Sequence, residues 1–172
     1  MNITDTTPTE SNLSGLDRKD FQKNINSRKT DLYILKNAQG MEVAVTNYGC
    51  AILSIMVPDK NGKFANVILG HDSIEHVINS PEPFLSTTIG RYGNRIANGK
   101  FTLYGEEHQL TVNNGPNSLH GGPTGFHARV WDAVQPNEST VIFNYTSADG
   151  EEGFPGTLEI EMTYRLEDEA NA

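Results

Sequence analysis

The chain has 172 residues, of which 36% are hydrophobic and 20% charged, a balance typical of a globular domain with a sizeable core. Its formal net charge of -9 argues against a nucleic-acid partner, because phosphate backbones are bound by clustered lysine and arginine. The sequence has no apolar run long enough for a membrane-spanning helix, so we expect no membrane contact.

The N-terminal part of the sequence is polar. Residues 1–10 have neither a basic start nor an apolar core, so they do not resemble an ordinary secretory signal, and we expect a cytoplasmic protein. Residues 1–28 carry little apolar surface, which predicts a flexible arm before a folded unit at residues 29–172. Leu16 and Phe21 are the only large apolar anchors in the segment between them, which allows a short docked turn there.

The single cysteine and the single tryptophan both fall in apolar surroundings. Cys50 has no partner for an internal disulfide, in agreement with a cytoplasmic location, and its apolar run predicts a buried, unreactive thiol. For Trp131 we expect core packing, although indole rings also stack on sugars.

Apolar residues alternate with polar ones from residue 31 onward, which is typical of β-strands. About ten short strands separated by turn signals favour an all-β antiparallel sandwich. The last strand is the most regular, with apolar side chains on one face and polar side chains on the other. The expected strands are two hairpins (31–45 and 100–111), two central strands (51–57 and 64–69), one antiparallel pair (129–134 with 140–146) and the last strand (157–166).

Two segments carry acidic or histidine residues of the kind that bind metals. His71 and His76 are too far apart for a zinc helix, which needs ligands four residues apart on one face. The segment 149–156 is acidic, but it lacks the ligand spacing of an EF-hand, so we interpret it as a turn. We therefore expect no metal.

The stretch from residue 88 to residue 122 has the composition of a site for a polar, neutral ligand. It carries arginine, asparagine and histidine side chains, which offer hydrogen bonds to hydroxyl groups, and glycines that allow close backbone approach. A long loop from Val112 to His127 holds the histidine, and ordered loops of this kind often carry binding residues. The candidate residues are Arg91, Asn94, Arg95, Asn113, Asn117 and His120.

Two motifs in this stretch resemble the aldose 1-epimerase (galactose mutarotase) family. They are Gly-Arg-Tyr-Gly-Asn-Arg-Ile at residues 90–96 and Asn-Ser-Leu-His-Gly-Gly at residues 117–122. Shorter matches support them in the family's order: Thr-Asn-Tyr-Gly (46–49), Val-Pro-Asp (57–59), Val-Ile-Leu-Gly (67–70) and Glu-Gly-Phe-Pro-Gly (152–156). The resemblance covers about residues 30 to 166 and implies the large β-sandwich of that family, here in part.

The resemblance implies a site and an activity. His120 matches the family's first active-site histidine, and Asn94 and Arg95 match the pair that binds sugar hydroxyls, with Arg91 and Asn117 in supporting places. Arg91 is expected to be structural, for instance in a buried ion pair. The implied reaction interconverts the α and β anomers of free galactose or glucose by acid–base ring opening and reclosure, without a cofactor.

The family's other proton-transfer groups have no match in this sequence. The second histidine belongs to an Asn-His-x-Tyr-Phe-Asn-Leu motif and the general base is a glutamate farther on, so the resemblance implies the N-terminal half of the family's usual chain, with a C-terminal half needed to complete the site. The alternative hypothesis is a non-catalytic sugar-binding sandwich without the acid and base. Sugar phosphates as substrates are disfavoured by the acidic charge and the single Asn–Arg pair.

Overall fold

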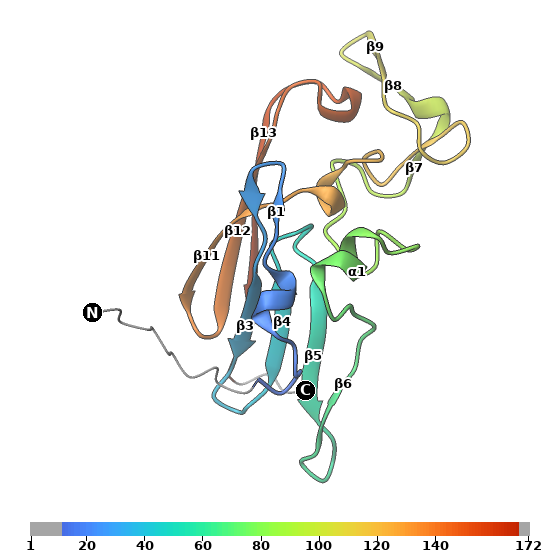
Figure 1. Cartoon of the computed structure of the whole chain (residues 1–172). Helices are drawn as coiled ribbons and strands as arrows, with labels where there is room; N and C mark the ends of the chain where they lie inside the picture. The colour runs from blue at the N-terminus through green and yellow to red at the C-terminus, as the bar shows by residue number, and fades with distance from the viewer. Residues whose placement is uncertain (1–11, 169–172) are drawn as a thin grey trace.

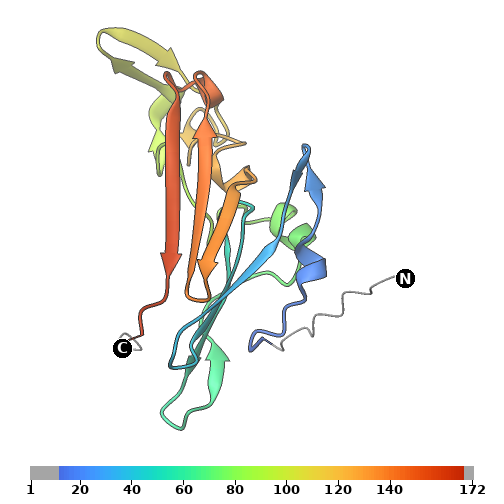
Figure 2. The same cartoon turned by 90° about the vertical axis from the view of Figure 1, so that its left-hand side faces the viewer.

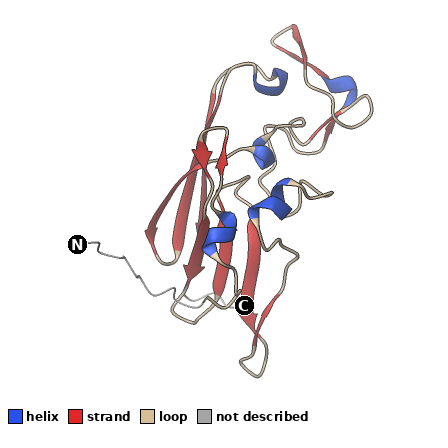
Figure 3. Cartoon of the chain, in the orientation of Figure 1, coloured by secondary structure: helices blue, strands red, loops and turns tan. Residues whose placement is uncertain are grey.

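The computed structural model describes residues 12–168, which form strands joined by turns and a few short helices (Figures 1 and 3). The helices are one turn of α-helix, α1 (Ile74–Ile78), and four 3-10 helices: η1 (Arg18–Phe21), η2 (Ala97–Gly99), η3 (Phe126–Ala128) and η4 (Glu151–Gly153). The strands are β1 (Asn24–Ile25), β2 (Arg28–Lys29), β3 (Leu32–Lys36), β4 (Glu42–Thr46), β5 (Ile52–Pro58), β6 (Phe64–Asn66), β7 (Arg95–Ile96), β8 (Lys100–Leu103), β9 (Glu106–Gln109), β10 (Ser118–Leu119), β11 (Asp132–Asn137), β12 (Thr140–Ser147) and β13 (Leu158–Arg165).

Two antiparallel sheets form the body of the protein. One has the strand order β3-β4-β5-β6 and the other the order β11-β12-β13. Figure 2 shows the second sheet in front of the first. Three further pairs, β1-β2, β8-β9 and β7-β10, lie outside these sheets, and they too are antiparallel. The predicted all-β antiparallel sandwich is therefore confirmed.

The four-stranded sheet is covered on both faces, and β4 is buried along its whole length as a result. One face of this sheet packs on the three-stranded sheet, in a cluster that includes Val43, Val45, Trp131 and Phe143. Its other face, with Ala44, packs on apolar residues of η1 and α1. Because side chains alternate along a strand, successive residues of β4 enter the two clusters. Trp131 is fully buried, which confirms its expected core position.

The predicted hairpins are present with their expected partners. Strands β3 and β4 pair around the Asn37–Gly40 turn, and β11 pairs with β12. Strands β8 and β9 are joined by a turn of only two residues, Tyr104 and Gly105, which both have positive φ (52° and 86°). Strand β9 therefore begins earlier than the sequence predicts. In β13, Ile160, Met162 and Tyr164 pack on the core, while the alternate residues are exposed, as expected.

Residues 12–28, which the sequence assigns to the arm, make specific contacts with the sheets. The Glu42 carboxylate, fully buried, accepts hydrogen bonds from the backbone amides of Leu13 and Ser14 at 2.8 and 2.9 Å. Phe21, the last residue of η1, is fully buried in the apolar cluster that also contains residues of α1. Leu16 packs on the same cluster. The two apolar anchors therefore dock, and packing begins before residue 29. Residues 1–11 lie outside the described part.

The connection between β6 and β7 contains α1. Ser73 caps it by accepting a hydrogen bond from the backbone amide of His76 at 3.4 Å. Within residues 12–168, no helix has both the length and the apolar character needed to cross a membrane.

Candidate functional site

A short ladder brings the two motifs of the site together. Strands β7 and β10 pair so that Arg95 faces Leu119 and Ile96 faces Ser118. Next to the ladder, the chain makes a close approach at Gly121, where a Cβ atom would lie 1.8 Å from the carbonyl oxygen of Gly90. The glycine is therefore required for these two segments to meet, and the ladder places His120 beside Asn94.

His120 and Asn94 are joined by two hydrogen bonds. The backbone amide of His120 donates to the carbonyl of Asn94 at 3.0 Å, and the backbone amide of Asn94 donates to His120 Nδ1, also at 3.0 Å. Because Nδ1 accepts a hydrogen bond, the neutral ring carries its proton on Nε2. His120 therefore offers a donor to a ligand, and its only lone pair on a ring nitrogen is already engaged.

Arg95 is exposed and its guanidinium is held by two amide oxygens. Its Nε donates to Asn114 Oδ1 at 2.8 Å and its Nη1 donates to Asn94 Oδ1 at 3.4 Å. A guanidinium has five N–H groups, so within the described residues others stay available to a ligand. The side chain lines a cavity of about 580 Å³ together with aromatic residues, among them Phe101 and Phe154.

Arg91 lines the same cavity, but its guanidinium binds the protein itself. Its guanidinium donates to the Ser147 hydroxyl and to the carbonyl oxygens of Ser147, Ala148, Pro155 and Gly156, at 2.8 to 3.1 Å. In the described part of the chain its partners are neutral oxygens rather than a carboxylate. The structural interpretation of Arg91 is thus supported by its contacts, but the suggested ion pair is wrong.

Asn113 and Asn117, two side-chain amides of the long loop, bind backbone groups of the protein. Asn113 closes it by accepting from the Leu119 amide at 2.7 Å and donating to the Leu119 carbonyl at 3.0 Å. Asn117 Oδ1 accepts from the backbone amide of Asn98 at 3.2 Å. These contacts favour a supporting place for Asn117, in which it shapes the turn before His120.

Two histidines contact one phenylalanine at the site. The ring of Phe84 meets the rings of His120 and His127 edge-on, at centroid distances of 4.7 and 4.6 Å. His127 is buried, and within the described residues its Nδ1 has no hydrogen-bond partner. Burial, followed by the nearby His120 ring, lowers the pKa of His127 to about 4. His127 is therefore neutral at physiological pH.

The acidic segment 149–156 forms a turn around η4, as predicted, and its carboxylates bind the protein. Glu151 accepts from the Tyr145 hydroxyl at 2.5 Å and from the Ser147 hydroxyl at 2.9 Å. Burial and then this hydrogen bond raise the pKa of Tyr145 to about 12. Glu152 accepts from the amide and the hydroxyl of Thr124. Both carboxylates therefore accept hydrogen bonds from protein groups.

No group of metal-ligating side chains gathers in the described residues, where a metal would need three or more of them close together. His76 Nδ1 instead contacts Asp72 Oδ1 at 2.5 Å. Cys50 is fully buried, and burial raises the pKa of its thiol, as expected for an unreactive cysteine.

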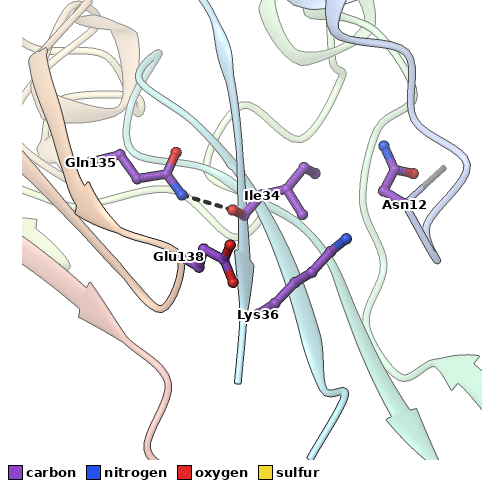
Figure 4. Close-up of a pocket in the computed structure, with 5 residues that line it drawn as sticks. All are labelled: Asn12, Ile34, Lys36, Gln135 and Glu138. Carbon is purple, nitrogen blue, oxygen red and sulfur yellow. Dashed lines mark hydrogen bonds between the residues drawn. The ribbon is translucent and has the colours of Figure 1, made fainter. Parts of the chain in front are cut away.

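A second hollow lies away from the predicted residues, between β3 and the turn that joins β11 to β12 (Figure 4). It has a volume of about 230 Å³. Gln135 bridges it by donating from Nε2 to the Ile34 carbonyl at 2.8 Å, so this contact joins the two sheets. None of the sequence-predicted site residues lines it.

Sequence reasoning missed Asn114, Phe84 and Glu152. Asn114 follows Asn113 in a turn, and nothing in the sequence indicates which of the two amides meets Arg95. Phe84 belongs to a connection without periodicity, between Pro83 and β7. A signal for Glu152 was present in the motif at residues 152–156, but a sequence match does not show what a side chain contacts.

The structure is thus an antiparallel β-sandwich with a group of polar side chains, among them Asn94, Arg95 and His120, on its loops and short ladder. The family model of aldose 1-epimerase matches residues 31–171. The chain therefore belongs to the aldose 1-epimerase family.

Relatives and solved structures agree with this assignment. The chain is 41% identical to the galactose mutarotase of Bos taurus over 74% of this chain and 36% of that protein, and 41% identical to the aldose 1-epimerase of Escherichia coli over 80% and 40%. The crystal structure of an aldose epimerase homologue from C. elegans superposes with a TM-score of 0.75 at 32% identity, covering 80% of this chain and 42% of that one. That of a galactose 1-epimerase from Lactobacillus acidophilus gives 0.73 at 30% identity, covering 86% and 43%. The chain thus spans less than half the length of these relatives.

Proposed function

We propose that the protein binds a free aldohexose, galactose or glucose, through Asn94, Arg95 and His120, and takes part in the interconversion of its α and β anomers. The observation that carries this proposal is that Asn94 bonds both side chains: its amide donates to His120 Nδ1, which leaves Nε2–H as a donor, and its Oδ1 accepts from the exposed guanidinium of Arg95. Donors of fixed geometry suit the hydroxyl and ring oxygens of a neutral sugar.

The tautomer of His120 limits what this residue does in the reaction. Anomer exchange needs a base for the proton of the C1 hydroxyl and an acid for the ring oxygen. With Nδ1 occupied and Nε2 protonated, His120 has no lone pair for the C1 proton. Its role is to donate to the ring oxygen or a neighbouring hydroxyl, where it stabilises the charge that develops as the ring opens.

The base and a second acid must come from other residues. Glu151 and Glu152 already accept hydrogen bonds from protein groups. We propose that a second histidine and a glutamate, supplied by polypeptide outside these 172 residues, complete the site. The alternative is a sugar-binding module without catalysis. The cytoplasmic location remains a prediction.

Two measurements on the purified protein test this function. Titration with galactose and glucose, followed by NMR of the Asn94 and His120 amides, is expected to show saturable shifts, and polarimetry of freshly dissolved α-galactose is expected to show little acceleration. Adding the C-terminal part of the Escherichia coli relative, beyond the segment matched here, is then expected to accelerate anomer exchange. A His120→Ala protein serves as the control and is expected to lower that activity by roughly 10²- to 10⁴-fold.

Each outcome has a definite meaning. Absence of saturable binding contradicts the proposed function altogether. Binding without acceleration in the complemented mixture favours the non-catalytic alternative. Strong acceleration by the purified protein alone establishes catalysis but overturns the proposal that outside residues complete the site.

A further inference from the structure

The loop that carries His120 has an unusual backbone, with three consecutive residues in the left-handed region. His120, Gly121 and Gly122 follow one another with positive φ values of 54°, 85° and 94°. No strand or helix contains these three residues, and β10 ends at Leu119. A backbone of this kind keeps one shape only when surrounding groups determine it.

The carboxylate of Glu152 is the group that enters this loop. Its Oε1 accepts a hydrogen bond from the Thr124 amide at 2.8 Å and another from the Thr124 hydroxyl. Its Oε2 lies against Gly122, where a Cβ atom would come within 2.6 Å. The side chain therefore occupies the space inside the loop and bonds its far end.

Glu152 is itself anchored, so it can act as a fixed support. Its backbone has φ 50° and ψ 20° within the η4 turn, and its carbonyl accepts from the Thr111 amide at 3.0 Å. The neighbouring Glu151 ties the same turn to β12 through the hydroxyls of Tyr145 and Ser147.

The same turn also holds the other half of the site. Arg91, a few residues before Asn94, donates to the carbonyls of Pro155 and Gly156 at 3.1 and 2.8 Å. The η4 turn thus contacts the segment with Asn94 through Arg91 and the loop with His120 through Glu152. It is connected to both partners of the Asn94–His120 hydrogen bond.

We propose that Glu152 is a positioning residue for the candidate sugar site: by bonding Thr124 it keeps the His120 loop in the shape that places His120 Nδ1 on the Asn94 amide. This rests on the proposed function only for the consequence that hexose binding depends on Glu152. The carboxylate acts as a hydrogen-bond acceptor in this role and exchanges no proton with the sugar.

The state of the His120 ring tests the proposal without any sugar. Long-range ¹⁵N–¹H spectra of the imidazole nitrogens of the purified protein, assigned with a His120→Gln protein, are expected to show the Nε2–H tautomer alone. Glu152→Ala is expected to give a mixture of both tautomers, because the Asn94–His120 bond is then made only part of the time. Glu152→Gln is expected to retain the single tautomer, since its amide oxygen has two lone pairs for the amide and hydroxyl of Thr124.

Matched variants separate positioning from general destabilisation. Glu159→Ala removes an exposed glutamate on β13 and is expected to leave the His120 spectrum unchanged. Thr124→Val keeps the amide but removes the hydroxyl, and it is expected to shift the tautomer balance in the same direction as Glu152→Ala, but less. If Glu152→Ala does not fold, the comparison of Thr124→Val with Glu152→Gln decides the question.

The outcomes distinguish this inference from the proposed function. A single unchanged tautomer in Glu152→Ala, with only a lower melting temperature, overturns the positioning role and leaves Glu152 merely structural. Tautomer mixing in Glu152→Gln equal to that in Glu152→Ala also overturns it. Hexose affinity is expected to fall roughly tenfold in Glu152→Ala, equivalent to one lost hydrogen bond. If the unmodified protein binds no hexose, the proposed function fails while the tautomer result still stands.

Discussion

The two arginines of the Gly-Arg-Tyr-Gly-Asn-Arg motif differ in what their guanidinium groups bind. Arg91 bonds one hydroxyl and four carbonyl oxygens of the β12–β13 connection, whereas Arg95 is exposed and bonds two amide oxygens. Sequence alone separates them only through the resemblance. Their contacts allow a prediction of opposite effects.

We predict that Arg91→Ala lowers the free energy of unfolding by about 2–4 kcal/mol, because several carbonyls lose their donor together. Arg95→Ala is expected to change it by less than about 1 kcal/mol and to weaken hexose binding instead. Urea unfolding and hexose titration of both proteins check this. Equal changes in both quantities for the two variants would contradict the division of roles.

His127 gives a prediction for pH. Its pKa in the folded protein is about 4, below the value near 6.5 of an exposed histidine, so unfolding between these values takes up a proton. Its contribution to stability is fully present above about pH 6.5 and is lost as the pH falls toward 4. The ionisable groups around it are His120, Glu152 and Arg129.

We expect the unfolding free energy of the unmodified protein to drop by about 1–3 kcal/mol more than that of His127→Phe between pH 7.5 and pH 4.5. The comparison removes the effect of carboxylates, which titrate in both proteins. His71→Gln, at a position outside the buried clusters, is expected to keep the unmodified difference. Identical pH profiles for His127→Phe and the unmodified protein would show that His127 is not held neutral.

At the level of elements, the tight turn between β8 and β9 is the clearest departure from residue preference. Tyr104 has φ 52° and its side chain is 98% exposed, so burial of the ring does not offset the cost of its left-handed conformation. Asparagine adopts this conformation more readily, and Asn-Gly is the preferred pair for such two-residue turns.

Tyr104→Asn is therefore expected to stabilise the β8–β9 hairpin by about 0.5–1 kcal/mol. Amide hydrogen exchange of β8 and β9 measures this locally, and thermal unfolding measures it globally. Tyr104→Ala is the control, because it removes the same ring without favouring the turn. Slower exchange in both variants would assign the effect to loss of the tyrosine ring.

Elements were predictable from the sequence where a single periodicity governs a segment. The alternation in β13 and the hairpin at β3 and β4 follow directly from local pattern. The docking of Leu13 and Ser14 was not, because it depends on the buried carboxylate of Glu42, which accepts hydrogen bonds from their backbone amides. Contacts between distant segments have no local signature.

The same limit applies to the candidate site. His120, Asn94 and Arg95 were found by their motifs, and the pairing of β7 with β10 brings them together. The protonation pattern of His120, the amide that orients Arg95 and the support from Glu152 arise from backbone positions that no residue pattern specifies. Sequence thus indicated which residues to consider, and structure indicated what each has left to offer a ligand.

At the scale of the whole molecule, the sheets have open edges and apolar side chains on the surface. Within residues 12–168, β13 pairs only with β12, so its other edge is unpaired. Val67, Leu69 and Val134 are exposed by 60%, 76% and 59%. Unpaired edges and exposed apolar groups favour association between molecules. The net charge of -9 opposes it through repulsion that salt screens.

We therefore expect the purified protein to associate reversibly, and more strongly as the salt concentration rises from about 10 mM to about 500 mM, where the Debye length falls well below 10 Å. Light scattering over a concentration series at each salt level measures this. Thr163→Lys, on the exposed face of β13, is expected to reduce association without changing the melting temperature, because a lysine on an edge strand discourages further pairing. Val134→Lys tests an exposed apolar side chain on β11 in the same way. A monodisperse monomer at every salt concentration would contradict the prediction, and a reduction by Val134→Lys alone would assign association to the apolar surface rather than to the β13 edge.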